Sequence, residues 1–119
     1  MKTETVEVEG YQITVAQATM RHGIERSLLI ADGQEAIKAD PEMPRGDQMM
    51  RLYLYPDLIA ATDKFVLPDG DEGTPTFELF ALLPDALYNV WGPAVYRLNP
   101  HWEVQEPEAA KKDAAKKAS

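Results

Sequence analysis

The sequence predicts an α+β fold: an N-terminal β-hairpin packed on three or four helices, mainly helical, with a disordered C-terminal tail. Apolar and polar residues alternate near the N-terminus, the spacing then becomes helical, and the chain ends in an alanine- and lysine-rich stretch. With 119 residues and no cysteine, one small domain stabilised by packing is expected. We place a single globular domain at residues 1–105 and a flexible tail at residues 106–119.

The hairpin is predicted over residues 4–15. In residues 5–9 and 11–15 every second side chain is apolar, which is typical of strands with one buried face. Only Glu9-Gly10 need turn the chain, and glycine accepts the positive φ of a tight turn.

From about Ala16 the apolar spacing becomes helical. Gly23 should weaken this helix by about 1 kcal/mol relative to alanine. Gly33 is a candidate C-terminal end, although the pattern could resume through Ile37. The apolar stripe expected along one side of the helix consists of Met20, Ile24, Leu28 and Ala31.

A second helical region is predicted over residues 48–62, after a loop at residues 39–46 that is rich in proline. Asp47 is a suitable N-cap. Because Pro56 lacks an amide donor and crowds the preceding turn, we expect a kink or a break at Tyr55-Pro56.

Residues 64–67 could form a short extended piece, and residues 69–75 an acidic loop. Thr76 is a reasonable cap for a short helical turn over residues 77–81, and Pro84 suits the first position of a further helix.

This last helix should end at Asn99-Pro100. Pro93 removes the donor for the Asn89 carbonyl, so we expect either a kinked helix or two short helices that meet at Gly92-Pro93. Its buried stripe is predicted to consist of Leu83, Leu87, Val90, Trp91, Ala94 and Leu98.

Charge and hydropathy exclude several classes of partner. The net charge is −8, and because residues 108–119 contribute +2, residues 1–107 carry −10. Such a body repels nucleic-acid phosphates. The N-terminus does not resemble a signal peptide, and no segment approaches the roughly 20 apolar residues of a membrane span. Neither nucleic acid nor membrane is expected as a partner.

No pattern supports catalysis, a cofactor or a metal. His22 and Glu25 have the spacing of a ligand pair, but the chain offers no second such cluster. The acidic run from Asp69 to Gly73 fails the EF-hand spacing, because Phe80 stands where a bidentate glutamate is needed. His101 lacks a cysteine or a suitably placed serine as nucleophile.

Four aromatic residues are candidates for contacts with a protein partner, since aromatic side chains are enriched where binding energy concentrates. Tyr88 and Tyr96 are the better ones because they lie off the buried stripe. In so small a domain, Trp102 and Trp91 are expected in the core rather than at a free surface. The four candidates are Tyr55, Tyr88, Tyr96 and Trp102.

Several blocks, taken in order, resemble the tail assembly chaperones of long-tailed bacteriophages. They are Arg51-Leu52-Tyr53-Leu54-Tyr55-Pro56-Asp57-Leu58-Ile59-Ala60-Ala61-Thr62, then Phe80-Ala81-Leu82-Leu83-Pro84, then Trp91, Val95-Tyr96 and Leu98-Asn99-Pro100-His101-Trp102. The resemblance covers roughly residues 11–104, and its motifs are structural rather than catalytic.

The resemblance implies a non-enzymatic chaperone that keeps the long tape measure protein soluble and helps to recruit tail tube subunits. It further implies action in the cytoplasm of the bacterial host, absence from the mature virion and possible self-association. Families of this kind often extend the chain by programmed frameshifting. Ala110-Lys111-Lys112 and Ala115-Lys116-Lys117 could be encoded by a slippery run.

Two other functions stay open at this stage. An acidic protein could mimic DNA and occupy a host nucleic-acid-binding protein; this predicts carboxylates at phosphate-like spacing and a strongly salt-sensitive complex. A small hydrolase could use His101 with Asp or Glu, which predicts a concave pocket that holds these groups.

Overall fold

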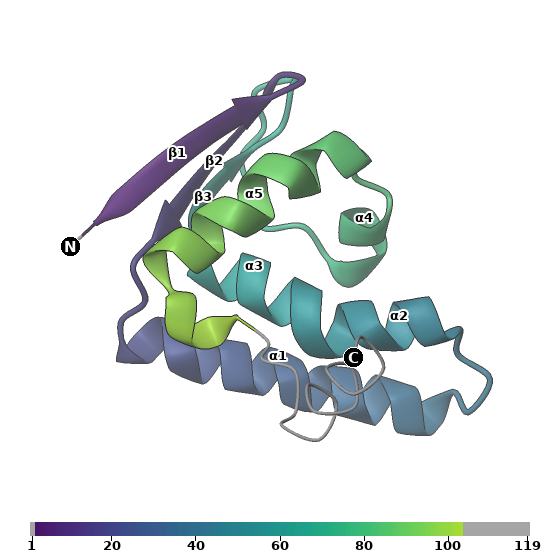
Figure 1. Ribbon diagram of the computed structural model, residues 1–119. Coiled ribbons are helices and arrows are strands. Elements are labelled where there is room, and N and C mark those ends of the chain that lie inside the picture. Colours follow the sequence, from purple (N-terminus) through teal and green to yellow (C-terminus); the bar gives the residue numbers. More distant parts are fainter. Residues whose placement is uncertain (1, 104–119) are drawn as a thin grey trace, which may run out of the picture.

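A computed structural model describes residues 2–103, and the architecture is α+β as predicted (Figure 1). The chain begins with strands β1 (Thr3–Val8) and β2 (Tyr11–Ala16), and β3 (Thr62–Val66) completes an antiparallel sheet in the order β1-β2-β3. The predicted tail at residues 106–119, with both Ala-Lys-Lys triplets, lies outside the described residues.

The predicted hairpin is confirmed. Val6 pairs with Ile13, and Glu9 and Gly10 both have positive φ, as a two-residue turn of type I′ requires. The extended piece predicted at residues 64–67 is β3, which pairs with β2 and turns the hairpin into a three-stranded sheet. The face with Ile13, Val15 and Phe65 is buried against helices.

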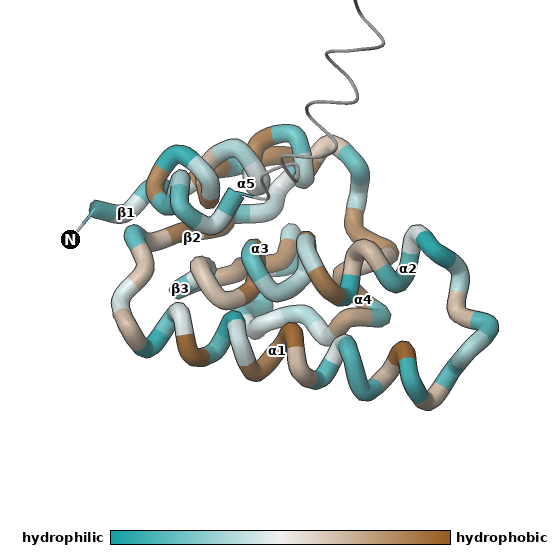
Figure 2. The backbone as a smooth tube through the Cα atoms, turned by 60° about the horizontal axis from the view of Figure 1, so that its bottom comes forward, coloured by the Kyte–Doolittle hydropathy of each residue, from teal (hydrophilic) through white to brown (hydrophobic). Residues whose placement is uncertain are grey.

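The helices form layers beside the sheet (Figures 1 and 2). Helix α5 (Asp85–Leu98) packs across β1 and β2, and α1 (Met20–Ala39) forms the opposite outer layer. Between them runs a continuous helical segment made of α2 (Arg45–Met49), the π-helical turn η1 (Met50–Leu54) and α3 (Tyr55–Ala61). The short α4 (Phe77–Ala81) closes one end, and η2 (Pro100–Trp102) follows α5.

A kink or a break was expected at Tyr55-Pro56, and the helix does not break there. The Tyr55 amide donates to the Met50 carbonyl, five residues back, so the hydrogen-bond pattern widens just before Pro56. A wider turn accommodates a residue without an amide donor and lets the helix run on. The predicted start is also wrong, since the helix begins at Arg45 with Pro44 rather than Asp47 at the N-cap.

Helix α5 is likewise continuous through Pro93, where two short helices were one expectation. Asn89 and Pro93 are both exposed, so the carbonyl that loses its donor faces water. The predicted end at Asn99-Pro100 is confirmed, as is the Thr76 cap, whose hydroxyl accepts from the Leu79 amide at 3.4 Å.

Helix α1 differs from its prediction in two ways. It continues past Gly33 to Ala39, and Gly33 is buried where α1 passes close to η1: a Cβ there would lie 2.7 Å from the Arg51 carbonyl oxygen. The predicted apolar stripe faces outward, with Met20, Ile24 and Leu28 exposed. The inward side carries Gly33 against η1, Arg26 paired with Asp57 of α3, and Leu29, which packs against the core.

Asn99 connects the sheet, α1 and α5. Its buried side-chain oxygen accepts from the Ala18 amide at 2.7 Å, and its side-chain nitrogen donates to the Ala16 carbonyl at 2.9 Å. The chain between β2 and α1 is therefore held to the C-terminal end of α5.

Candidate functional site

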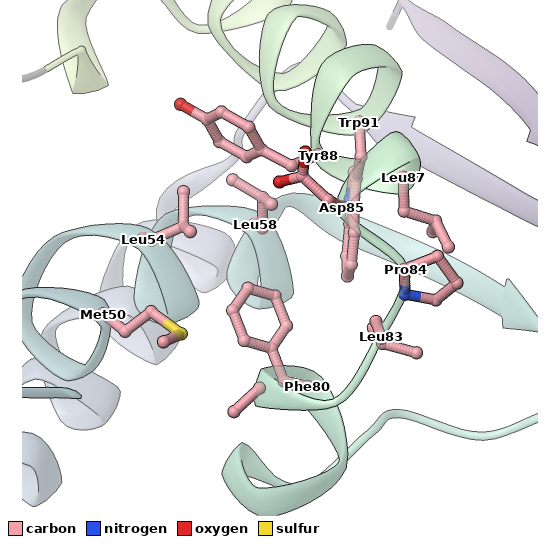
Figure 3. A pocket seen from close by; sticks show the side chains of 11 residues that line it. Met50, Leu54, Leu58, Phe80, Leu83, Pro84, Asp85, Leu87, Tyr88 and Trp91 are labelled. Atoms are coloured by element: carbon pink, nitrogen blue, oxygen red, sulfur yellow. The ribbon is translucent and has the colours of Figure 1, made fainter. Parts of the chain in front are cut away.

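An open apolar pocket lies between η1, α3, α4 and α5 (Figure 3). Its volume is about 370 Å³. Phe80 and Trp91 project into it from α4 and α5, while Met50 and Leu54 face them from η1 (Figure 3). Tyr88 and Asp85 lie along the α5 side and supply a hydroxyl and a carboxylate. The pocket suits an apolar side chain.

The walls of the pocket are fixed by a string of aromatic contacts. The Phe65 and Trp91 ring centroids are 5.3 Å apart, Trp91 and Phe80 5.7 Å, and Phe80 and Tyr55 5.1 Å. The Trp91 indole N–H donates to the Thr62 hydroxyl at 3.0 Å. These contacts join the sheet, α5, α4 and α3, so the pocket floor is part of the core.

Two leucines that are next to α4 lining residues in the sequence are exposed. Leu82 is 81% exposed, and Leu79 is more than half exposed. Both flank lining residues, since Leu79 precedes Phe80 and Leu82 lies between Ala81 and Leu83. An apolar pocket with exposed leucines beside it is the kind of surface that marks a protein-binding site.

Of the four predicted contact residues, Tyr88 is the one that the structure places at this pocket. Its side chain is on the wall and 45% of the residue is exposed. The ring lies against Gly92 on the next turn of α5: a Cβ on Gly92 would come within 2.9 Å of the Tyr88 Cε2 atom. Gly92 therefore leaves room for the ring to lie along the helix, a role the sequence analysis missed.

Tyr55 supports the pocket from behind. Its ring contacts Phe77 and Phe80 edge-on, and its hydroxyl donates to the Pro75 carbonyl at 3.0 Å. Burial, and secondly the Glu78 carboxylate, raise the pKa of Tyr55 above its usual value.

Tyr96 and Trp102 belong to a second cluster, built around Asp57. Asp57 is only 1% exposed; its carboxylate accepts from Arg26 Nε at 2.5 Å and from the Tyr96 hydroxyl at 2.8 Å. The Arg26 guanidinium also lies 5.2 Å from the centre of a Trp102 ring. Burial raises the pKa of Tyr96, and the hydrogen bond to Asp57 adds to this.

This second cluster joins α1, α3, α5 and η2, and Tyr96 also lines a hollow beside Tyr88. Trp102 is 6% exposed, and Tyr96 is partly buried with its hydroxyl already paired. The geometry assigns both side chains a packing role. Their suggested part in partner binding stays a prediction, as does that of Tyr55.

The residues tested for metal or acid–base chemistry are dispersed. His22 accepts from the Thr19 amide through Nδ1 and lies 2.9 Å from Asp63 through Nε2, so it caps α1 and ties it to β3. Within residues 2–103, no three His, Asp or Glu side chains are grouped as metal ligands. His101 is exposed beside Trp102, and among the described residues that line its hollow, Glu103 is the one carboxylate.

Comparisons with known proteins add no identification. No protein-family model matches the chain, and no curated protein or solved structure is significantly similar to it. Among the described helices, none is long and apolar enough to cross a membrane.

Proposed function

We propose that this protein is a phage tail assembly chaperone that binds the tape measure protein through the α4–α5 pocket. The observation that carries the proposal is the open apolar pocket of about 370 Å³, with exposed leucines next to its lining residues in the sequence. The ordered sequence blocks that resemble tail assembly chaperones supply the client. The pocket supplies a place where an apolar side chain of that client would leave water.

The distribution of charge fits such a holding function. Residues 1–107 carry −10, which keeps a complex in solution while its apolar contacts are covered. On this proposal the protein acts without catalysis in the host cytoplasm and is absent from the mature virion. Tail tube subunits are a second partner, and self-association accompanies assembly.

Co-expression with the tape measure protein tests the proposal. The wild-type chain should move the tape measure protein from the insoluble to the soluble fraction, and an unchanged distribution would refute the function. A DNA mimic would instead leave the tape measure protein insoluble and form a strongly salt-sensitive complex with a DNA-binding protein.

Two matched pairs of variants test the site. Ala81→Trp fills the pocket mouth, and Ala31→Trp makes the same change on the exposed side of α1. Leu82→Asp removes an exposed leucine beside the pocket, and Leu28→Asp removes another exposed leucine from α1. The pocket variants should lose the client and the α1 variants should keep it. The reverse result would place the client on α1.

A further inference from the structure

We infer that the pocket selects a helical client segment with a bulky apolar anchor flanked by lysine or arginine, because carboxylates line both hollows of the groove. The inference rests on the proposed function and concerns the chemistry of the segment bound at the same site.

The pocket is one end of a longer depression. A second hollow, of about 240 Å³, shares Leu54 and Tyr88 with the pocket and adds Tyr53, Tyr96 and Glu103. A segment with its anchor in the pocket, between the contacting Phe80 and Trp91 rings on one side and Met50 and Leu54 on the other, can thus continue over Tyr88 towards Glu103. Two adjoining hollows with a tyrosine between them suit an amphipathic helix that contacts the groove on successive turns.

The free charges along this path are negative. Asp85 lines the pocket, Glu103 lines the second hollow, and neither forms an ion pair with another residue in the described part of the chain. The nearby cations are engaged, since Arg26 pairs with Asp57 and Arg97 donates to Glu4 at 2.6 Å. A basic residue next to the anchor would find two carboxylates, whereas an acidic one would be repelled.

Other occupants fit less well. The remaining chain, residues 104–119, has Val104 as its only large apolar side chain and places Glu106 and Glu108 close to Glu103 in the sequence. A second copy could offer the exposed α1 stripe, but Glu25 and Asp32 on that helix would approach an acidic groove. A partner with positive charge beside its apolar anchor matches both properties of the groove.

The test uses the full chain and two synthetic amphipathic peptides of about five turns. Both peptides carry the same leucine stripe, and the other positions bear lysine in one and glutamate in the other. Fluorescence anisotropy at low salt should show the lysine peptide binding on the order of fivefold to tenfold more tightly. This ratio should fall towards one in about 1 M salt, where screening acts over ~3 Å.

Paired variants separate the rim carboxylates from the general field of the protein. Asp85→Asn with Glu103→Gln should abolish the preference for lysine. Asp32→Asn with Glu35→Gln removes the same charge from exposed positions of α1 and should leave the preference intact. Equal binding of both peptides by the wild-type chain, or a preference that survives loss of the rim carboxylates, would overturn the inference.

The outcome also distinguishes this inference from the proposed function. If Ala81→Trp abolishes solubilisation of the tape measure protein while the rim variants change nothing, only the charge selection is wrong. If peptide binding is unaffected by Ala81→Trp, the pocket is not the binding site and the inference falls with it. Self-association that Ala81→Trp abolishes would assign the groove to a second copy and also overturn the inference.

Discussion

Replacing Gly33 by alanine tests the close approach of α1 to η1. Alanine normally stabilises an exposed helix interior by about 1 kcal/mol relative to glycine. At Gly33 the new Cβ would lie 2.7 Å from the Arg51 carbonyl oxygen and 3.2 Å from its carbon. Both are backbone atoms, so no side-chain rotation relieves the contact, and α1 must move away from η1.

The magnitude follows from two opposing terms. Overpacking a well-packed contact costs about 1–3 kcal/mol, and the gain in helix propensity offsets about 1 kcal/mol of that cost. Gly23 lies on the same helix, and a Cβ at that position would meet no atom within 4 Å, so Gly23→Ala should gain the propensity term alone. The two variants should therefore differ by about 1–3 kcal/mol, Gly33→Ala being the less stable.

Urea unfolding followed by tryptophan fluorescence measures this difference, since Trp91 and Trp102 are buried and report on the core. In a domain of this size, 1 kcal/mol corresponds to about 4–8 °C in melting temperature. If the Gly33→Ala variant proves as stable as the Gly23→Ala variant, α1 and η1 do not pack as closely as described.

Three further changes test other parts of the structure. Asn99→Ala should cost about 1–3 kcal/mol for each buried backbone group that it leaves unpaired, measured by urea unfolding; a loss within error would show that Asn99 does not hold the connection. Folding raises the pKa of Tyr96 above its usual value, chiefly through burial and then through its hydrogen bond to Asp57. The contribution of Tyr96 to the free energy of unfolding is therefore complete below about pH 10 and is lost as the pH rises further. The Tyr96→Phe variant should lose less stability than the wild-type protein between about pH 9 and 11. If the urea midpoints of both proteins fall equally over this range, the raised pKa of Tyr96 is wrong. Gly92→Ala should displace the Tyr88 ring and weaken capture of the client without loss of helicity by circular dichroism; unchanged capture would mean that the ring position is unimportant.

Local patterns were sufficient for elements whose causes lie within a few residues. The hairpin followed from alternation and from Gly10, and the Thr76 cap and the end of α5 at Asn99-Pro100 followed from turn chemistry. The prolines were harder. Pro56 stays inside a helix because a π-helical turn precedes it, and Pro93 stays inside α5 because the carbonyl that loses its donor faces water. Neither arrangement can be predicted from the neighbouring residues in the sequence alone.

The candidate site was only partly accessible from sequence. Tyr88 was recognised because it lies off the buried stripe of α5, and it is at the pocket wall. Gly92 was predicted only as the place where two short helices could meet. Its packing role was missed because the Tyr88 ring, which occupies the space a Gly92 side chain would fill, comes from the preceding turn. The buried hydrogen bonds of Asp57 could not be predicted, because its partners Arg26 and Tyr96 are distant in the sequence.

The sequence by itself determined the α+β class, the order of strands and helices, the acidic body and the run of large apolar residues from Phe77 to Trp102. These follow from spacing, turn residues and composition, which are local or additive properties. Tertiary structure decided that β3 joins the hairpin, that the Met20–Leu28 stripe faces outward, and that the apolar run forms a pocket with η1. Each of these depends on which surfaces meet across long sequence separations, and side-chain periodicity shows that a face is apolar without showing what covers it.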